Sequence, residues 1–343
     1  MNMPAKWIAL STLCGMALGA SSGSAGQSAT PRLTGTFIQL LEAHGRWGDL
    51  QWMNLFNSLK SIGIRDLVVQ WSVLDGSAFY TSRTLPQIAN APLEELLDQA
   101  DQYGMRVFVG LAHDSDYWTN IQKSPADAET YLSKLRARSI TAANELSPIL
   151  KKHRSFAGWY VPEEIDDVNW RAPESRRILI THLSALGTEL RRLAPSNPIA
   201  ISTYSQAQSS PEFFGQFWDD VFRQTPINLL FFQDGVGVSN LELNELPSYL
   251  TSVRSSARNN GRKMQVVVEL FRQVAGPPID KDDFRAVPGP IERVREQLAL
   301  AAQYSDDGIT GFSVPEYMSP LGMDGAAELL AAYQTAITTN DSK

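Results

Sequence analysis

Cysteine is almost absent from this sequence, because the 343 residues include only Cys14. Cys14 lies in an apolar run, 7–20, that follows Lys6 and precedes a stretch rich in serine, glycine and alanine. The run is too short to span a bilayer comfortably, and the three-part pattern predicts a secretory signal peptide over 1–29. Its cleavage would leave a mature chain without cysteine, which excludes both a disulfide framework and a thiol nucleophile. We therefore expect a periplasmic or secreted protein, with an uncleaved inner-membrane anchor as the alternative.

A basic stripe is also absent. The chain has 30 lysine and arginine residues against 37 acidic residues, a net charge of -7, and its basic residues are scattered along the sequence. Nucleic acid is therefore not an expected partner. The composition is 43% hydrophobic and 20% charged, which is typical of a globular protein with a large core. A neutral or polyhydroxylated ligand fits this charge balance better than a polyanion.

Histidine is scarce, and the four histidines are widely separated in the sequence. His153 and His182 fall in predicted helices, where a surface or core role is expected. No paired histidine spacing supports a metal site, so we expect neither metal nor cofactor. The segment 113–116, His-Asp-Ser-Asp, remains an alternative ligand set for a hard cation or zinc. Ser-His-Asp hydrolysis is disfavoured because the sequence lacks a Gly-x-Ser-x-Gly elbow.

Eight apolar strand-like runs alternate with eight helix-like segments after residue 35. This repeat predicts a single (β/α)8 barrel over 30–343, since no linker divides the chain. A doubly wound open sheet is the alternative, but no glycine-rich phosphate loop follows the first strand. The predicted strands are 36–40, 65–73, 105–111, 156–161, 198–204, 227–234, 263–269 and 308–315, and the predicted helices are 49–61, 92–104, 125–152, 174–193, 211–223, 245–259, 290–304 and 325–338.

Polar and aromatic side chains follow the predicted strands, at the end of a barrel where active sites form. Carboxylates, amides and aromatic rings gather there, whereas turn residues dominate the opposite ends. The residues predicted to bind substrate are Gln39, Gln70, Trp71, His113, Asp114, Trp118, Trp170, Tyr204, Gln233, Asp234, Glu316 and Tyr317. Several aromatic rings on one rim favour stacking against sugar faces, although any one of them could instead be packing in the core.

Two acidic strand ends carry a more specific pattern. The segment 158–165, Gly-Trp-Tyr-Val-Pro-Glu-Glu-Ile, resembles the fourth-strand signature of the retaining, cellulase-like clan of glycoside hydrolases, in which the strand ends in Asn-Glu-Pro. The segment 266–271, Val-Val-Val-Glu-Leu-Phe, is similar to that clan's seventh-strand signature. The resemblance implies that Glu164 is the acid/base and Glu269 the nucleophile. Glu163 stands where the clan has Asn, and Ile165 where it has Pro.

A second resemblance covers nearly the whole mature chain. The segments 35–39, 69–72 and 159–170 resemble a bacterial family of exported, glycoside-hydrolase-like barrels catalogued as a domain of unknown function. This resemblance implies the barrel fold and the position of the site. It implies less about the substrate, because the family is not defined by an activity.

Glycoside hydrolysis needs two carboxyl groups, one to protonate the leaving oxygen and one to attack or stabilise the sugar cation. Glu164 and Glu269 can face each other across the mouth, with Glu163, Gln70 or Asp234 tuning the proton balance. Adjacent strand residues point to opposite faces, so Glu163 and Glu164 cannot both point inward unless the strand bends, and we expect Glu164 to do so. We therefore predict a glycoside hydrolase acting on an oligo- or polysaccharide. A non-catalytic barrel that binds glycan or scaffolds an envelope polysaccharide system is the alternative.

Overall fold

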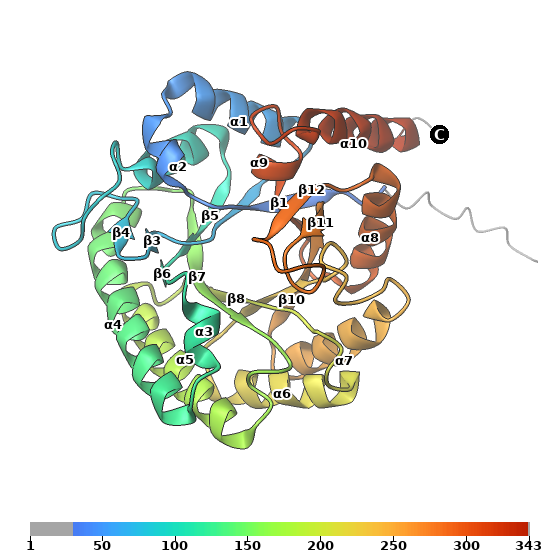
Figure 1. Cartoon of the computed structure of the whole chain (residues 1–343). Helices are drawn as coiled ribbons and strands as arrows, with labels where there is room; N and C mark the ends of the chain where they lie inside the picture. The colour runs from blue at the N-terminus through green and yellow to red at the C-terminus, as the bar shows by residue number, and fades with distance from the viewer. Residues whose placement is uncertain (1–29, 342–343) are drawn as a thin grey trace, which may run out of the picture.

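A computed structural model describes residues 30–341, so the predicted signal peptide and Cys14 lie outside the described residues. The chain forms a closed barrel of eight parallel strands surrounded by helices (Figure 1), and this confirms the predicted (β/α)8 fold. The strands lie around the barrel in the order β1-β13-β10-β9-β8-β7-β5-β2. Their bounds are β1 Leu33–Ile38, β2 Asp66–Val69, β5 Arg106–Gly110, β7 Phe156–Ile165, β8 Ile199–Thr203, β9 Leu229–Gln233, β10 Lys263–Glu269 and β13 Ile309–Phe312.

The outer helices begin at the expected signals. Ser124 and Ser210 accept hydrogen bonds from backbone N–H groups three residues later, and a proline follows each of them, so both helix starts are capped. The long helices are α1 Asp49–Ser61, α2 Pro92–Tyr103, α4 Pro125–Leu150, α5 Pro173–Leu193, α6 Pro211–Gln224, α7 Leu246–Asn259, α8 Ile291–Tyr304 and α10 Ala326–Asp341. No helix among residues 30–341 is long and apolar enough to cross a membrane.

Two layers of apolar side chains stabilise the barrel. The interior layer includes Phe37, Phe108, Tyr160, Phe231 and Val267, one from each of five strands, and all five are buried. A larger cluster fills the space between the strands and the helices. Because side chains alternate along each strand, the interior layer identifies which residues at the strand ends point into the barrel.

Several predicted strands have different bounds in the structure. The strand predicted over 308–315 ends at Phe312, and the short helix α9 Val314–Tyr317 follows it. β2 ends at Val69, because Val73–Leu74 (β3) leaves the barrel and pairs with Ser77–Ala78 (β4) and Ala112–His113 (β6) in a small separate sheet. β7 does not end at Val161 but continues to Ile165, through Pro162 and both glutamates. His153 is not in a helix, since α4 ends at Leu150 and His153 lies in the turn before β7.

Several elements were not predicted. A hairpin formed by β11 Phe271–Ala275 and β12 Arg285–Pro288 follows β10. Three short helices also lie in loops that follow strands, η1 Glu42–Arg46, α3 Tyr117–Ile121 and α9 Val314–Tyr317. All four elements follow the carboxyl ends of barrel strands, so they shape the rim where the predicted site lies.

Candidate active site

The inward face of each strand can be followed to its carboxyl end. On β9, Leu229 and Phe231 belong to the interior layer, so Gln233 continues the same face. On β10, Val267 belongs to that layer, and Glu269 follows it by two residues. The register pairs Gln233 with Val267, which places Glu269 one layer nearer to the mouth than Gln233.

The alternation of side chains along β7 determines where the two adjacent glutamates point. Tyr160 belongs to the interior layer, so Glu164 continues that face, whereas Val161 and Ile165 lie in the outer cluster with Glu163 between them. A bulge in the same segment, where Val161 pairs with Ile201 and Ile165 with Thr203, leaves this alternation unchanged. Glu164 points into the barrel, where Gln233 Nε2 donates to its Oε1 at 2.9 Å. Loss of solvent around this carboxyl raises the pKa of Glu164, while the bond from Gln233 partly opposes the rise. A carboxyl in this setting is suited to hold a proton.

Glu163 points out of the barrel, toward α5. Its Oε1 forms a hydrogen bond of 2.7 Å with Nε2 of His182, and both side chains are 1% exposed. Glu163 Oε2 and His182 Nδ1 have no hydrogen-bond partner within the described residues. Glu163 therefore contacts a residue of the helix layer and does not face the mouth. His182 lies in the core, one of the two roles expected for it, but no feature of the sequence indicates that it meets Glu163.

Glu269 lies at the end of β10, covered by the segment that follows β9. Its Oε2 accepts hydrogen bonds from the backbone N–H groups of Gly237 at 2.7 Å and Val238 at 3.1 Å. The side chain is 4% exposed. Burial raises the pKa of Glu269, and the nearby charge of Asp234 raises it further, whereas the two N–H groups lower it. Glu269 is therefore inward by strand position but is closed off from the mouth.

Asp234 lies behind the barrel wall. Its Oδ2 accepts from Gln297 Nε2 at 2.6 Å, and its Oδ1 accepts from the backbone N–H of Glu269 at 3.3 Å. The side chain is 1% exposed, and burial raises the pKa of Asp234. Asp234 therefore does not line the mouth as predicted. It fixes the end of β10 and acts on the protonation of Glu269.

A second polar group occupies the mouth beside β1. Gln39 Nε2 donates to Gln70 Oε1 at 2.8 Å, and the backbone N–H of Gln39 donates to Glu316 Oε1 at 3.4 Å. Ser313 Oγ donates to the other oxygen of Glu316. Burial raises the pKa of Glu316 to about 7. The structure thus brings together three of the residues that the sequence predicted to line the mouth.

Aromatic rings lie beside these carboxyls. Trp118 meets Tyr204 with ring centroids 5.9 Å apart, and the charges of Asp166 and Glu164 add to burial in raising the pKa of Tyr204. On the other side, burial and the charges of Glu316 and Glu269 raise the pKa of Tyr317 to about 12. These three rings are partly exposed and accompany the two groups of carboxyls.

Two predicted aromatic positions are less accessible. Trp71 is 6% exposed, lies flat against His113 with centroids 5.3 Å apart, and donates from Nε1 to the carbonyl of Leu40. Trp170 is 1% exposed and packs in the outer core. Trp170 therefore does not lie on the rim, and no face of its ring is free to stack on a ligand. The sequence could not separate a rim tryptophan from one that folds back into the core.

The segment 113–116 is held by other contacts. Asp114 pairs with Arg138 at 2.7 Å, and Ser115 donates to Asp75 through its backbone N–H at 2.8 Å. Burial lowers the pKa of His113, which the charges of Glu163, Asp75 and Asp114 partly oppose. These contacts hold the loop after β5 against α4 and the loop after β2.

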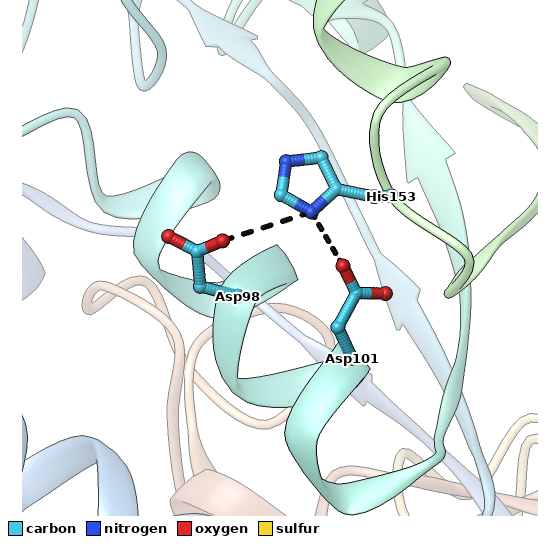
Figure 2. A group of neighbouring side chains, drawn as sticks. All are labelled: Asp98, Asp101 and His153. Carbon is cyan, nitrogen blue, oxygen red and sulfur yellow. Dashed lines mark hydrogen bonds and ion pairs between the residues drawn. The ribbon is translucent and has the colours of Figure 1, made fainter.

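A histidine and two aspartates meet far from the mouth. Nδ1 of His153 lies 2.8 Å from Asp101 Oδ2 and 3.8 Å from Asp98 Oδ1, and both aspartates come from α2 (Figure 2). Asp101 also accepts from the backbone N–H of Ser155 at 2.7 Å. These contacts tie the end of α2 to the turn before β7, at the amino ends of the strands. The donor set is compatible with a metal ion, but it is accounted for by this structural role.

A cavity of about 500 Å³ also lies away from the strand ends. It is bounded by α8, α10 and the residues before β1, with Tyr333 and Ile337 among its lining. The chemistry gathered at the mouth does not extend to it.

The fold is a closed (β/α)8 barrel with carboxyl groups at the carboxyl ends of its strands. The chain belongs to the family described as Domain of unknown function (DUF4434), whose model matches residues 33–323. It is 30% identical over 265 residues to the Escherichia coli K12 protein YbcH, described as uncharacterized, covering 76% of this chain and 82% of that protein.

Solved structures share this fold. A "putative alpha-L-fucosidase" from Bacteroides thetaiotaomicron matches with a TM-score of 0.74 and 21% identity, over 93% of this chain and 99% of that one. A GH18 chitinase from Pseudoalteromonas aurantia matches with a TM-score of 0.52 and 13% identity, over 90% and 99%. A beta-galactosidase from Marinomonas ef1 matches with a TM-score of 0.57 and 12% identity, over 90% and 60%.

Proposed function

We propose that the chain is a glycoside hydrolase that cleaves an oligo- or polysaccharide, with Glu164 as the general acid/base and Glu269 as the nucleophile. The observation that carries this proposal is the position of both carboxyls on inward-facing strand ends of one barrel, on β7 and β10. The likeness to solved glycosidase barrels supports the fold on which the proposal depends.

Glu164 suits the acid role because its pKa is raised by loss of solvent. Gln233 holds the carboxyl through Oε1, which leaves Oε2 to deliver a proton to the leaving oxygen. Tyr204 and Trp118 lie together beside this carboxyl and would contact a sugar bound next to it. Gln39, Gln70, Glu316 and Tyr317 would hold hydroxyl groups on the other side of the mouth.

Glu269 must lose its proton and become accessible before it can attack a sugar. In the closed arrangement, burial and Asp234 favour its protonated form, and Gly237 and Val238 occupy one of its oxygens. Substrate binding would therefore displace the segment 235–239 from Glu269. Released from this cover, the carboxylate would regain solvent or a substrate hydroxyl, and its pKa would fall.

The burial of Glu269 specifically favours a second candidate function. If the segment 235–239 never moves, Glu269 stays covered, and the mouth offers Glu164, Glu316, amides and aromatic rings, which suffice to bind a glycan but not to cleave it by the mechanism that needs Glu269. The chain would then be a glycan-binding or scaffolding barrel. Both proposals are consistent with export, which determining the N-terminal residue of the mature protein would test.

The discriminating experiment uses two variants, Glu164→Gln and Glu269→Gln, with the exposed Glu42→Gln as a matched control. We expect each site variant to lower sugar release from a natural glycan at least about 1,000-fold while its unfolding midpoint stays near that of the unmodified protein. Glu164→Gln should lose much less on an aryl glycoside whose leaving group needs no proton. Equal release by both variants and the control would show that these carboxyls are not catalytic. Retained glycan binding with no hydrolysis by the unmodified chain would establish the binding function.

A further inference from the structure

The hairpin β11–β12 exposes large apolar side chains beside the barrel mouth. Phe284, immediately before β12, is 53% exposed, and Ile279 in the same connection is 55% exposed. Burying a phenylalanine side chain is worth roughly 1.5–3 kcal/mol, so leaving it in water forgoes that gain. An exposed aromatic ring beside a candidate site offers a flat apolar face on which a ligand can pack.

The exposed ring of Phe284 is connected to the mouth by other rings. Its centroid lies 6.0 Å from that of Phe271, which is 4% exposed. Phe271 in turn lies 5.1 Å from Tyr317 and 6.2 Å from Phe312. Phe312 borders the interior layer of the barrel, and Tyr317 lies near Glu316 and Glu269. A continuous line of aromatic rings therefore runs from the candidate site to the hairpin.

The connection that carries Phe284 is built by specific hydrogen bonds. Gln273 Nε2 donates to the carbonyl oxygens of Ala275, Gly276 and Pro277, at 3.0–3.1 Å. The backbone N–H of Gln273 donates to the carbonyl of Gly237 at 2.9 Å, which ties the hairpin to the segment over Glu269. Arg285, next to Phe284, pairs with Ala275 of β11, so the backbone beside the ring is already ordered and little conformational freedom is lost there when a ligand binds.

The surroundings of the ring indicate what it binds. The exposed residues next to it are Asp280, Lys281, Asp282, Asp283 and Arg285, so the ring lies among charged groups that can form hydrogen bonds. A sugar matches this surface, since its C–H face can cover an aromatic ring while its hydroxyl groups reach the polar border. A membrane or a second copy of the chain would require a wider apolar patch. Three carboxylates against two cations also disfavour an anionic ligand.

We infer that Phe284 forms a subsite for one sugar of a longer, neutral or amino-sugar glycan whose central units occupy the mouth. The ligand class in this inference rests on the proposed function. The substrate is then an oligosaccharide of several units, because the line of rings from the mouth to Phe284 extends beyond the groups that contact a single linkage.

Binding of soluble glycans by the full chain tests the inference without requiring hydrolysis. Retardation in gels containing hydroxyethylcellulose, galactomannan or glycol chitosan would identify a retained glycan, with alginate as the anionic comparison. Calorimetry with the disaccharide and hexasaccharide of that glycan would then compare the unmodified chain with Phe284→Ala, Phe284→Trp and the control Leu50→Ala. Leu50 is 61% exposed and lies on α1.

We expect Phe284→Ala to weaken hexasaccharide binding about tenfold and to leave disaccharide binding unchanged, while Phe284→Trp and Leu50→Ala behave like the unmodified chain. The inference would be overturned if Phe284→Ala weakened binding of both lengths equally, did not weaken binding, or behaved like Leu50→Ala. It would also be overturned if gels containing alginate retained the chain better than the others, or if no neutral or amino-sugar glycan retained it. Hydrolysis without a Phe284 effect on binding would overturn the subsite alone. A length-dependent effect in a chain that releases no sugar would overturn the hydrolase proposal alone.

Discussion

The carboxyl of Glu316 should make the stability of the barrel depend on pH. Burial raises the pKa of Glu316 from 4.5 to about 7 in the folded protein. Below pH 4.5 the group is protonated in both the folded and the unfolded state, so it adds no pH dependence there. Between pH 4.5 and 7 the folded state binds the proton more tightly, and the free energy of unfolding falls as pH rises. Above pH 7 the penalty is complete. Each pKa unit is worth about 1.4 kcal/mol, so the penalty is about 3 kcal/mol.

Glu316→Gln removes this titration and keeps the shape of the side chain. We expect the free energy of unfolding of the variant, relative to the unmodified protein, to rise by about 3 kcal/mol between pH 4.5 and pH 8. Urea unfolding at pH 4.5, 6 and 8, followed by tryptophan fluorescence, measures this difference. The amide alters the contacts with Gln39 and Ser313 at every pH, so only the change with pH is diagnostic.

Glu42→Gln is the control, because Glu42 is exposed on the loop after β1. It should leave the pH dependence unchanged. A constant difference between Glu316→Gln and the unmodified protein from pH 4.5 to 8 would refute the reasoning, as would a difference that falls with pH.

Three further changes test buried contacts at the strand ends and behind the barrel wall. Gly237→Ala would place a Cβ 2.6 Å from the carbonyl oxygen of Phe271 and 2.8 Å from Glu269 Oε2. We therefore expect the free energy of unfolding, measured by chemical denaturation, to fall by about 1–3 kcal/mol. A hydrogen-exchange rate at Val238 equal to that of the unmodified protein would contradict this expectation. Asp167→Asn should lower the free energy of unfolding in urea by about 2–3 kcal/mol, because the Asp167 carboxylate accepts hydrogen bonds from Ser205, Gln206, Gln208 and Ser209. An unchanged unfolding midpoint would show that these bonds are dispensable. His182→Leu should lower the free energy of unfolding by about 3 kcal/mol, because it leaves buried Glu163 without its partner. In the same assay, adding Glu163→Gln should recover part of this loss. Additive losses in the double variant would refute a coupling between His182 and Glu163.

The succession of strands and helices was predictable from the sequence because local patterns determine it. Helices such as α1 and α2 bury one face, and capping serines and prolines mark the starts of α4 and α6, so their bounds agree with prediction within a few residues. Eight such units have one common closed arrangement. The gathering of Gln39, Gln70 and Glu316 at the mouth follows from strand order alone, because parallel strands end on the same face.

The details of the site depend on contacts between distant residues, which local patterns do not contain. Pro162 and the two glutamates indicate the end of a strand, yet β7 continues through them, and its alternation lets Glu163 meet His182 of α5 while Glu164 meets Gln233 of β9. The hairpin β11–β12 was missed because its strands are short and its connection is rich in proline and acidic residues. The sequence predicts Trp170 on the rim, and the structure buries it, because position after a strand does not determine which way a loop folds.

Glu269 is the residue at which the two proposed functions diverge. Its pKa is raised by burial and by Asp234, and lowered by two backbone N–H groups that belong to the same segment that buries it. Moving the segment 235–239 would therefore remove two favourable hydrogen bonds and the burial penalty together. A substrate can offset the lost bonds by offering its own hydroxyl groups to the carboxylate, while the freed N–H groups turn to solvent. A hydrolase requires this exchange at each turnover, whereas a glycan-binding barrel can keep Glu269 covered, so hydrogen exchange at Gly237 and Val238 should accelerate on glycan binding only if the chain is an enzyme.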